Sequence, residues 1–238
     1  MAESVAAESR FAVKRVLGLR SILAINIGLI IGSGIFITPA AVLQQAGSPA
    51  LSLLMWLLPA GLSLLVGLCF LELFSAMPVS GGEYKYFFEL YGPLVGFLSA
   101  WTFNLQLFTV YRAILSLTIT RCLVAFFFLL KILCLTVIIV IGCVRIAQGH
   151  TENLEIGFEG STYSSGVMAV SVQVGIFIYI GWNDIFNVIE EVEKAKRNVP
   201  LGMFLSLLIV ACLYLLTNVA YFTVLSPEEL LNVHMVVT

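Results

Sequence analysis

The hydrophobic positions of this chain fall into long runs separated by short polar segments. A membrane-spanning helix needs about 20 predominantly apolar residues. About six runs reach or approach that length, near residues 21–45, 50–77, 94–111, 122–147, 168–189 and 201–225. The pattern therefore predicts an all-α polytopic membrane protein with about six membrane helices.

The first run is interrupted by Gly32, Ser33 and Gly34. Gly costs about 1 kcal/mol relative to Ala in a helix, and an unsatisfied backbone group in hydrocarbon costs several kcal/mol. A span therefore breaks only where the freed groups face protein, water or a ligand. A half-helix that begins at Ile35 would direct its free N–H groups at an anion such as a carboxylate. Taken alone, these small residues are also compatible with close helix packing.

A second interruption, in the run over 168–189, favours the ligand interpretation. Gly181 is followed by Trp182, Asn183 and Asp184, which places polar atoms at a depth where they are costly. Paired interrupted spans are the best sequence indicator of a transporter binding site. We therefore expect the two breaks to lie together.

Composition agrees with a membrane protein and excludes other classes. The chain has 238 residues, is 60% hydrophobic and 11% charged, and has a mean hydropathy of +1.04. A net charge of −2 gives no basic balance that would suggest nucleic acid. The five cysteines form no CxxC pair, so we expect neither a metal site nor a disulfide framework. We expect no cofactor, and no grouping of nucleophile, base and orienting residue suggests an enzyme.

Basic residues predict the orientation of the chain. Lys14, Arg15 and Arg20 precede the first run, which places residues 1–20 in the cytoplasm by the positive-inside rule. Lys194, Lys196 and Arg197 mark a second cytoplasmic loop, whereas the acidic segment 148–166 suits an outer loop. The aromatic segment 80–93 suits a short helix at the headgroups.

The middle of the chain violates this topology by one crossing. The runs near 94–111 and 131–147 both have to lead outward, with no inward span between them. Either the region 94–121 does not span, or an inward span is missing. We favour a missing span.

Several segments together resemble a known family. They are IGSGIF, ELFSAMPVSGGEYKYFFELYGPLVGFLSAW, LLKILCLTVIIVIG, AQGHTENLEIGFEG, GWN, EEVEKAKRNVPLG and LTNVAYFTVLSPEELL. Because these segments occur in this order, the chain resembles the light, transport-competent subunits of the heteromeric amino acid transporters. These include L-type and b0,+-like transporters, within the amino acid–polyamine–organocation superfamily.

The resemblance implies a LeuT-like fold, in which two inverted repeats surround a site formed by broken first and sixth helices. The glycine motif of the first break would hold the substrate carboxylate, an aromatic residue would close over the substrate, and the second break would receive the amino group. The substrate-binding residues implied in this way are Gly32, Ser33, Gly34, Ile35, Phe177, Gly181 and Trp182. Ile180 departs from the small residue common in the family, and a β-branched residue there stiffens the break.

The resemblance also implies that the chain is incomplete. The family has about twelve spans, and the match covers about half of such a protein. Residues 1–20 would form a cytoplasmic segment, and 21–238 a membrane domain that contains the first repeat without its fourth helix, plus the sixth and seventh helices. The loop that links relatives to a single-span glycoprotein heavy subunit by a disulfide is missing, and the context of the nearest cysteine, Cys122, does not match.

The resemblance implies exchange of neutral, often large or aromatic, amino acids by alternating access, with cystine and dibasic amino acids as a further substrate class. Relatives act at the plasma membrane, and a truncated chain could be retained in the endoplasmic reticulum. We expect that this chain alone does not transport. One alternative is a non-transporting protein that binds a full-length relative or a heavy subunit. Two others are a homodimeric half-transporter and, with least support, a channel.

Overall fold

The computed structural model describes residues 15–32, 34–78, 80–102 and 121–231, with the backbone alone described for 121–128. Within these ranges the regular structure is helical, apart from one isolated bridge. The elements are α2 (Leu19–Ile30), α3 (Gly34–Ala46), α4 (Pro49–Ala76), α5 (Gly82–Tyr91), α7 (Arg121–Ala147), α8 (Glu152–Glu155), α9 (Ser165–Ile178), the 3₁₀ turns η1 (Asp184–Asn187) and η2 (Ile189–Glu191), and α10 (Ala195–Val224). The predicted all-α class is confirmed.

Three of the described helices are long and apolar enough to cross a membrane, namely α4, α10 and the part Leu129–Ala147 of α7. The pair α2 and α3, which is bent by 49°, is a fourth candidate. The run predicted over 168–189 is shorter in the structure, because α9 ends after 14 residues. The run predicted over 94–111 begins with the helix Pro93–Thr102, and its remainder lies outside the described residues.

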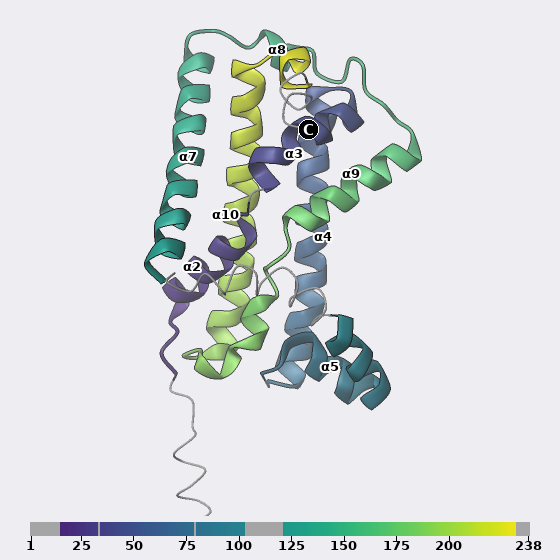
Figure 1. Ribbon diagram of the computed structural model, residues 1–238, viewed down its shortest axis with the longest axis vertical. Helices are drawn as coiled ribbons and strands as arrows, with labels where there is room; N and C mark the ends of the chain where they lie inside the picture. Colours follow the sequence, from purple (N-terminus) through teal and green to yellow (C-terminus); the bar gives the residue numbers. More distant parts are fainter. Residues whose placement is uncertain (1–14, 33, 79, 103–120, 232–238) are drawn as a thin grey trace, which may run out of the picture.

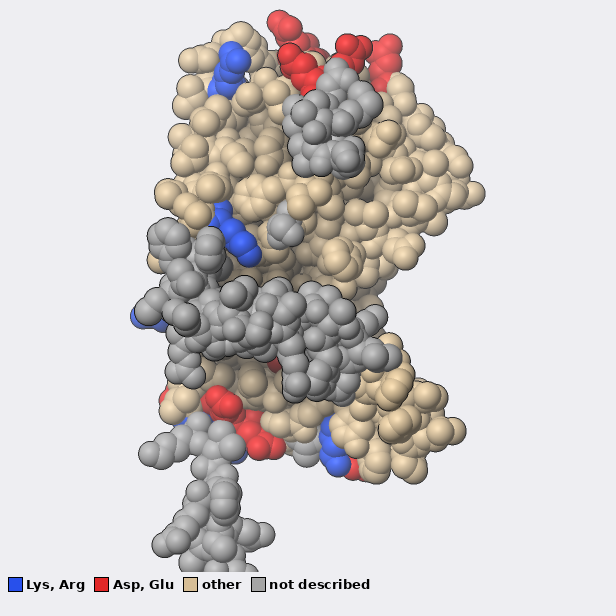
Figure 2. Space-filling model, in the orientation of Figure 1, with Lys and Arg blue, Asp and Glu red and all other residues tan. Residues whose placement is uncertain are grey.

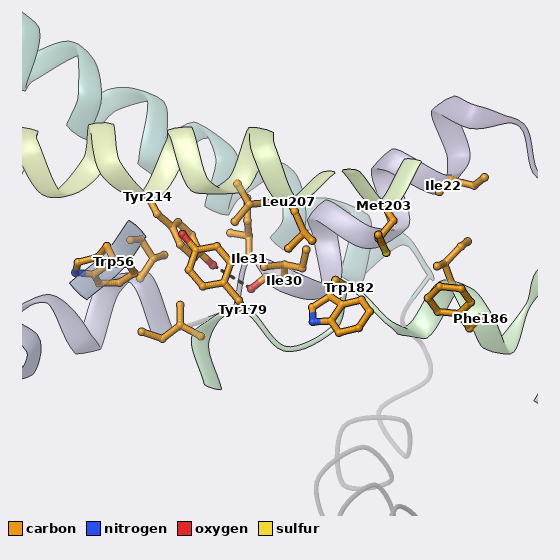
Figure 3. Packing of buried hydrophobic residues seen from close by; sticks show 14 of the residues in the cluster. Ile22, Ile30, Ile31, Trp56, Tyr179, Trp182, Phe186, Met203, Leu207 and Tyr214 are labelled. Atoms are coloured by element: carbon orange, nitrogen blue, oxygen red, sulfur yellow. Dashed lines mark hydrogen bonds between the residues drawn. The ribbon is translucent and has the colours of Figure 1, made fainter. Parts of the chain in front are cut away.

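The helix α10 lies at the centre of the bundle and packs against α2, α4 and α7 (Figure 1). Small residues allow two of these close approaches. A Cβ at Gly202 of α10 would meet the side chain of Ile22 on α2, and a Cβ at Gly142 of α7 would meet Ala220 on α10. The largest fully buried side chains include Trp56, Tyr179 and Tyr214, so the core lies between α4, α9 and α10 (Figure 3).

Segments with predicted cytoplasmic and outer positions lie at opposite ends of the bundle (Figure 1). At one end, the backbone N–H groups of Val16 and Leu17 donate to the carbonyl oxygen of Glu191, both at 2.9 Å. The helix α5 lies at this end, and its predicted interfacial character agrees with exposed aromatic side chains such as Tyr84 and Tyr91. The opposite end carries α8. We call these the α5 end and the α8 end.

At the α8 end, the loop before α9 is fixed to the corner between α3 and α4. The N–H of Thr162 donates to the carbonyl oxygen of Ala46 at 2.9 Å, and the hydroxyls of Ser48 and Ser161 lie 2.7 Å apart. Gly47 has φ +76°, and a Cβ there would meet the carbonyl oxygen of Gly160. The corner therefore requires glycine, both for its backbone conformation and for the close approach of the loop.

Candidate binding site at the two helix breaks

The first break frees two carbonyl groups that side chains from distant helices then satisfy. In a continuous helix, the carbonyl oxygens of Ile30 and Ile31 would accept from residues four positions later. Here the hydroxyl of Tyr214 on α10 donates to the Ile30 oxygen at 3.0 Å. The ammonium group of Lys131 on α7 donates to the Ile31 oxygen at 3.4 Å. The break is thus built into the tertiary structure rather than left open.

The other side of the first break presents donors. The helix α3 begins at Gly34, so the N–H groups of its first turn have no intrahelical acceptor. The positive end of the α3 dipole lies at this point, and the charge of Lys131 lies across the break, on the Ile31 carbonyl oxygen. Both favour a negatively charged group at this point, and Ile35, which is fully buried, keeps water from the first turn. The arrangement suits a carboxylate.

The second break packs directly on the first. After α9 ends, Gly181 has φ +112°, a conformation that side chains disfavour. A Cβ at this position would lie 3.1 Å from the carbonyl carbon and the Cβ of Leu29, and 3.3 Å from the nitrogen of Ile30. Ile178, at the end of α9, lies against Gly34, where a Cβ would be 3.4 Å from its side chain. The two interruptions predicted from the sequence therefore meet.

The remaining predicted residues differ in how far their side chains are buried. Trp182 is 9% exposed, and its ring packs edge-on against Phe70 at 5.6 Å between ring centroids. Phe177 is 71% exposed, so its ring is not buried against either break. Ile180 is 56% exposed, so its side chain points away from the core instead of crowding it. Ser33 lies outside the described residues.

Sequence reasoning missed the two side chains that complete the first break. A span over 131–147 that leads outward would begin at Lys131, at its cytoplasmic end, but α7 begins at Arg121, so Lys131 lies in its interior. A lone charge within an apolar run is a signal for a functional position, and it could have identified Lys131. Tyr214 gives no such signal, because a tyrosine in an apolar helix is ordinary. Figure 3 shows it beside Tyr179, with its hydroxyl directed at Ile30.

The segment after the second break is held by α5. The side-chain amide of Asn183 donates to the Glu83 carboxylate at 2.7 Å, and the N–H of Glu190 donates to the hydroxyl of Ser80 at 3.1 Å. These bonds connect α5 and Ser80, which precedes it, to the segment that follows the second break. Movement of one is therefore expected to involve the other.

A protein-family model described as amino acid permease matches residues 17–128 and 119–237, which is nearly the whole chain. The chain belongs to the amino acid permease family. It is a transporter family, not an enzyme family, and its fold is LeuT-like. The predicted family resemblance and fold class are thereby confirmed for a chain that is a part of such a fold.

Several curated relatives are similar to this permease family member over most of its length. Asc-type amino acid transporter 1 of Homo sapiens is 36% identical over 269 residues, covering 95% of this chain and 51% of the relative. Human Large neutral amino acids transporter small subunit 2 is 34% identical, covering 92% and 49%. Human b(0,+)-type amino acid transporter 1 is 31% identical, covering 93% and 54%. The chain spans about half the length of the curated relatives it matches.

Proposed function

We propose that this chain forms the broken-helix part of the binding site of an amino acid exchanger. Gly32, Ser33, Gly34 and Ile35 hold the substrate carboxylate at the start of α3. The observation that carries the proposal is the contact of Gly181 with the backbone of Leu29 and Ile30. This contact places the end of the second interrupted helix beside the first break.

The amino group of the substrate is received at the second break. Beyond the end of α9, the carbonyl oxygens of Gly181 and Trp182 have no α-helical donors; the Gly181 oxygen accepts a long bond from the N–H of Asp184 at 3.4 Å, and a primary ammonium supplies three donors. Phe177 closes over the substrate once the helices that complete the site in full-length relatives are present. In the present structure its ring is 71% exposed, so closure requires a movement or a further wall.

The proposed substrates are neutral amino acids, with large or aromatic side chains favoured, and cystine and dibasic amino acids as the second class. The names of the relatives support the first group, because one is described as a transporter of large neutral amino acids. The apolar surroundings of the breaks, with Ile35 and Ile178 buried, also favour an uncharged side chain. Exchange follows if the loaded carrier reorients by alternating access more readily than the empty one.

We further propose that a protein with these 238 residues alone does not transport. The apolar face of α7 is exposed, with Leu133, Val137 and Val140 each about half exposed or more, so among the described residues no helix covers that side. The organisation that we propose is a cytoplasmic segment over 1–20 and a membrane domain over 21–238 that lacks one inward span. In support, the alignment to the Asc-type transporter extends over 269 residues, more than the chain contains, and the family match divides into two parts near 119–128.

The second candidate function is that of a non-transporting partner, which binds a full-length relative or the single-span heavy subunit through its open faces. The exposed apolar side of α7 favours it, because such a face is covered either by lipid or by another helix. Localisation follows the partner, at the plasma membrane for a completed transporter and in the endoplasmic reticulum for an unassembled chain.

Binding and transport are tested separately on purified protein. Equilibrium binding of radiolabelled leucine in nanodiscs should be saturable, and Gly181→Ala should lower the affinity at least ten-fold. Gly61→Ala is the matched control, because nothing lies within 4 Å of a Cβ at Gly61. Saturable leucine binding that Gly181→Ala leaves unchanged would refute the proposed site.

In liposomes loaded with unlabelled leucine, uptake by the chain alone should stay at background, and measurable exchange would refute the proposed incompleteness. Co-purification with a relative or a heavy subunit, without leucine binding, would favour the second candidate.

A further inference from the structure

The α8 end holds a polar groove that is separate from the two breaks. Its volume is about 250 Å³, and its lining includes Arg145, His150, Glu152, Asn153, Ser226 and Glu229. Figure 2 shows acidic side chains gathered at this end of the molecule, with basic atoms beside them. Arg145 and Lys131 lie about four turns apart on α7, which corresponds to about 21 Å along the helix. The groove is therefore distinct from the site at the first break.

The groove forms where two packed helices stop touching. A Cβ at Gly142 of α7 would meet Ala220 of α10, so the two backbones approach closely there. Arg145 occupies the next turn of the same face of α7, at the level where α10 ends at Val224. Beyond Val224 the chain leaves the α-helix, and Arg145 lines the groove together with Thr223, Val224 and Ser226.

Hydrogen bonds fix the acidic side of the groove. The side-chain amide of Asn153 donates to the carbonyl oxygen of Leu225 at 3.3 Å, which connects the α8 loop to the end of α10. The N–H of Ser226 donates to Oε2 of Glu229 at 2.8 Å, and the N–H of Glu229 donates to the Ser226 hydroxyl at 3.2 Å. This reciprocal pair is a capping box. It leaves Oε1 of Glu229 without a partner among the described residues.

The charged groups of the groove are not paired with one another. Among the residues that the structure describes, Arg145, Glu152 and Glu229 take part in no ion pair, although all three line the same groove. Hydrogen bonds from Ser226 lower the pKa of Glu229 below its usual value, so its carboxylate is ionised at neutral pH. A simple anion would be repelled by the two carboxylates, and a simple cation by the guanidinium. A ligand that carries both charges satisfies both sides.

We propose that this groove binds the zwitterionic head group of a free amino acid, with the carboxylate on Arg145 and the ammonium between Glu152 and Glu229. Arginine offers a planar pair of donors that matches a carboxylate. The volume, which equals that of about eight water molecules, accommodates an amino acid of modest size. The groove is thus an outer amino acid site, about 20 Å from the breaks. The choice of an amino acid rests partly on the proposed function, so the experiment measures the two sites separately.

Photoaffinity labelling provides that separation. Protein in nanodiscs is irradiated with a diazirine analogue of leucine, digested, and analysed by mass spectrometry. We expect label in peptides that contain 145–155 or 223–231, and separately in peptides that contain 27–38 or 177–184, with excess leucine abolishing both. Arg145→Gln should reduce labelling of the outer peptides about ten-fold, because it removes the charge-assisted hydrogen bonds to the carboxylate, and should leave the peptides at the breaks labelled.

The matched pair Glu229→Gln and Glu159→Gln tests the acidic side. Both residues are exposed acids at the α8 end, but Glu159 does not line the groove. Only Glu229→Gln should weaken outer labelling. Retained labelling at the breaks shows that each variant is folded.

Three outcomes would overturn the proposal. The first is label at the breaks without label at the outer peptides, which leaves the proposed function standing. The second is outer labelling that Arg145→Gln does not reduce. The third is equal outer labelling by a diazirine carboxylic acid without an amino group, which would indicate an anion site. Outer label without label at the breaks would instead support this groove and contradict the proposed function.

Discussion

The hydroxyl of Tyr214 provides the sharpest test of how the first break is stabilised. Tyr214→Phe removes the donor to the carbonyl oxygen of Ile30 but keeps the aromatic ring, which packs at 5.5 Å from Trp56 and 5.3 Å from Tyr179. The Ile30 oxygen still accepts from the N–H of Gly32 at 2.8 Å. The carbonyl is therefore not left without a partner, and the loss is that of one hydrogen bond.

The magnitude follows from that accounting. A protein hydrogen bond contributes about 0.5–1.5 kcal/mol net, and interhelical bonds in a membrane average about 0.6 kcal/mol. We therefore expect Tyr214→Phe to lower the free energy of unfolding by about 1 kcal/mol, roughly a five-fold change in the equilibrium constant. The measurement is reversible unfolding in mixed micelles by titration with a denaturing detergent, followed by far-UV circular dichroism.

Tyr221→Phe is the matched control, because it lies two turns further along α10 and its hydroxyl has no hydrogen bond among the described residues. It should change the free energy of unfolding by much less. Equal losses in the two variants would refute the assignment of Tyr214 as the donor that satisfies the break. A loss above about 3 kcal/mol would mean that the ring packing, not the hydroxyl, had changed.

Three further predictions concern backbone approach and charge. Gly142→Ala should separate α7 from α10 and cost about 1–3 kcal/mol of unfolding free energy, since its Cβ would overlap Ala220; the unfolding titration used for Tyr214 checks it, and an unchanged midpoint would contradict the contact. Gly47→Ala, at φ +76° and against the Gly160 carbonyl, should release the loop 157–162 and increase its proteolysis, whereas Gly166→Ala, with nothing nearby, should not. Because hydrogen bonds from Ser226 lower the pKa of Glu229, the bond from the Ser226 N–H to its carboxylate should be intact at neutral pH and weaken as pH falls through that lowered pKa; loss of protection of the Ser226 amide in acid, measured against its intrinsic exchange rate and absent in Glu229→Gln, would be the sign, and unchanged protection would contradict it.

The sequence determined the helical class and the positions of the two breaks, whereas the described residues form three or four candidate spans where about six were predicted. Apolar runs required helices, since hydrocarbon offers no partner for backbone groups. Glycines in two of those runs indicated where the helices would stop, and α2 ends at Ile30 while α9 ends at Ile178, close to the predicted positions. Hydropathy and glycine content depend only on neighbouring residues, so they could be assessed from the sequence alone. The incomplete match to the family and the missing crossing near 94–121 also followed from the sequence.

Only the tertiary structure decided which groups surround the breaks. Lys131 and Tyr214 reach carbonyls 100 and 184 positions away in the chain, and nothing in their own neighbourhoods specifies that partnership. The same holds for Arg145 and Glu229, which share a groove because α7 and α10 pack through Gly142 and α10 ends about one turn later. Apolar periodicity fixes which residues can be buried, whereas the choice of partner depends on how helices of similar composition cross, and that is decided by the shape of their small residues.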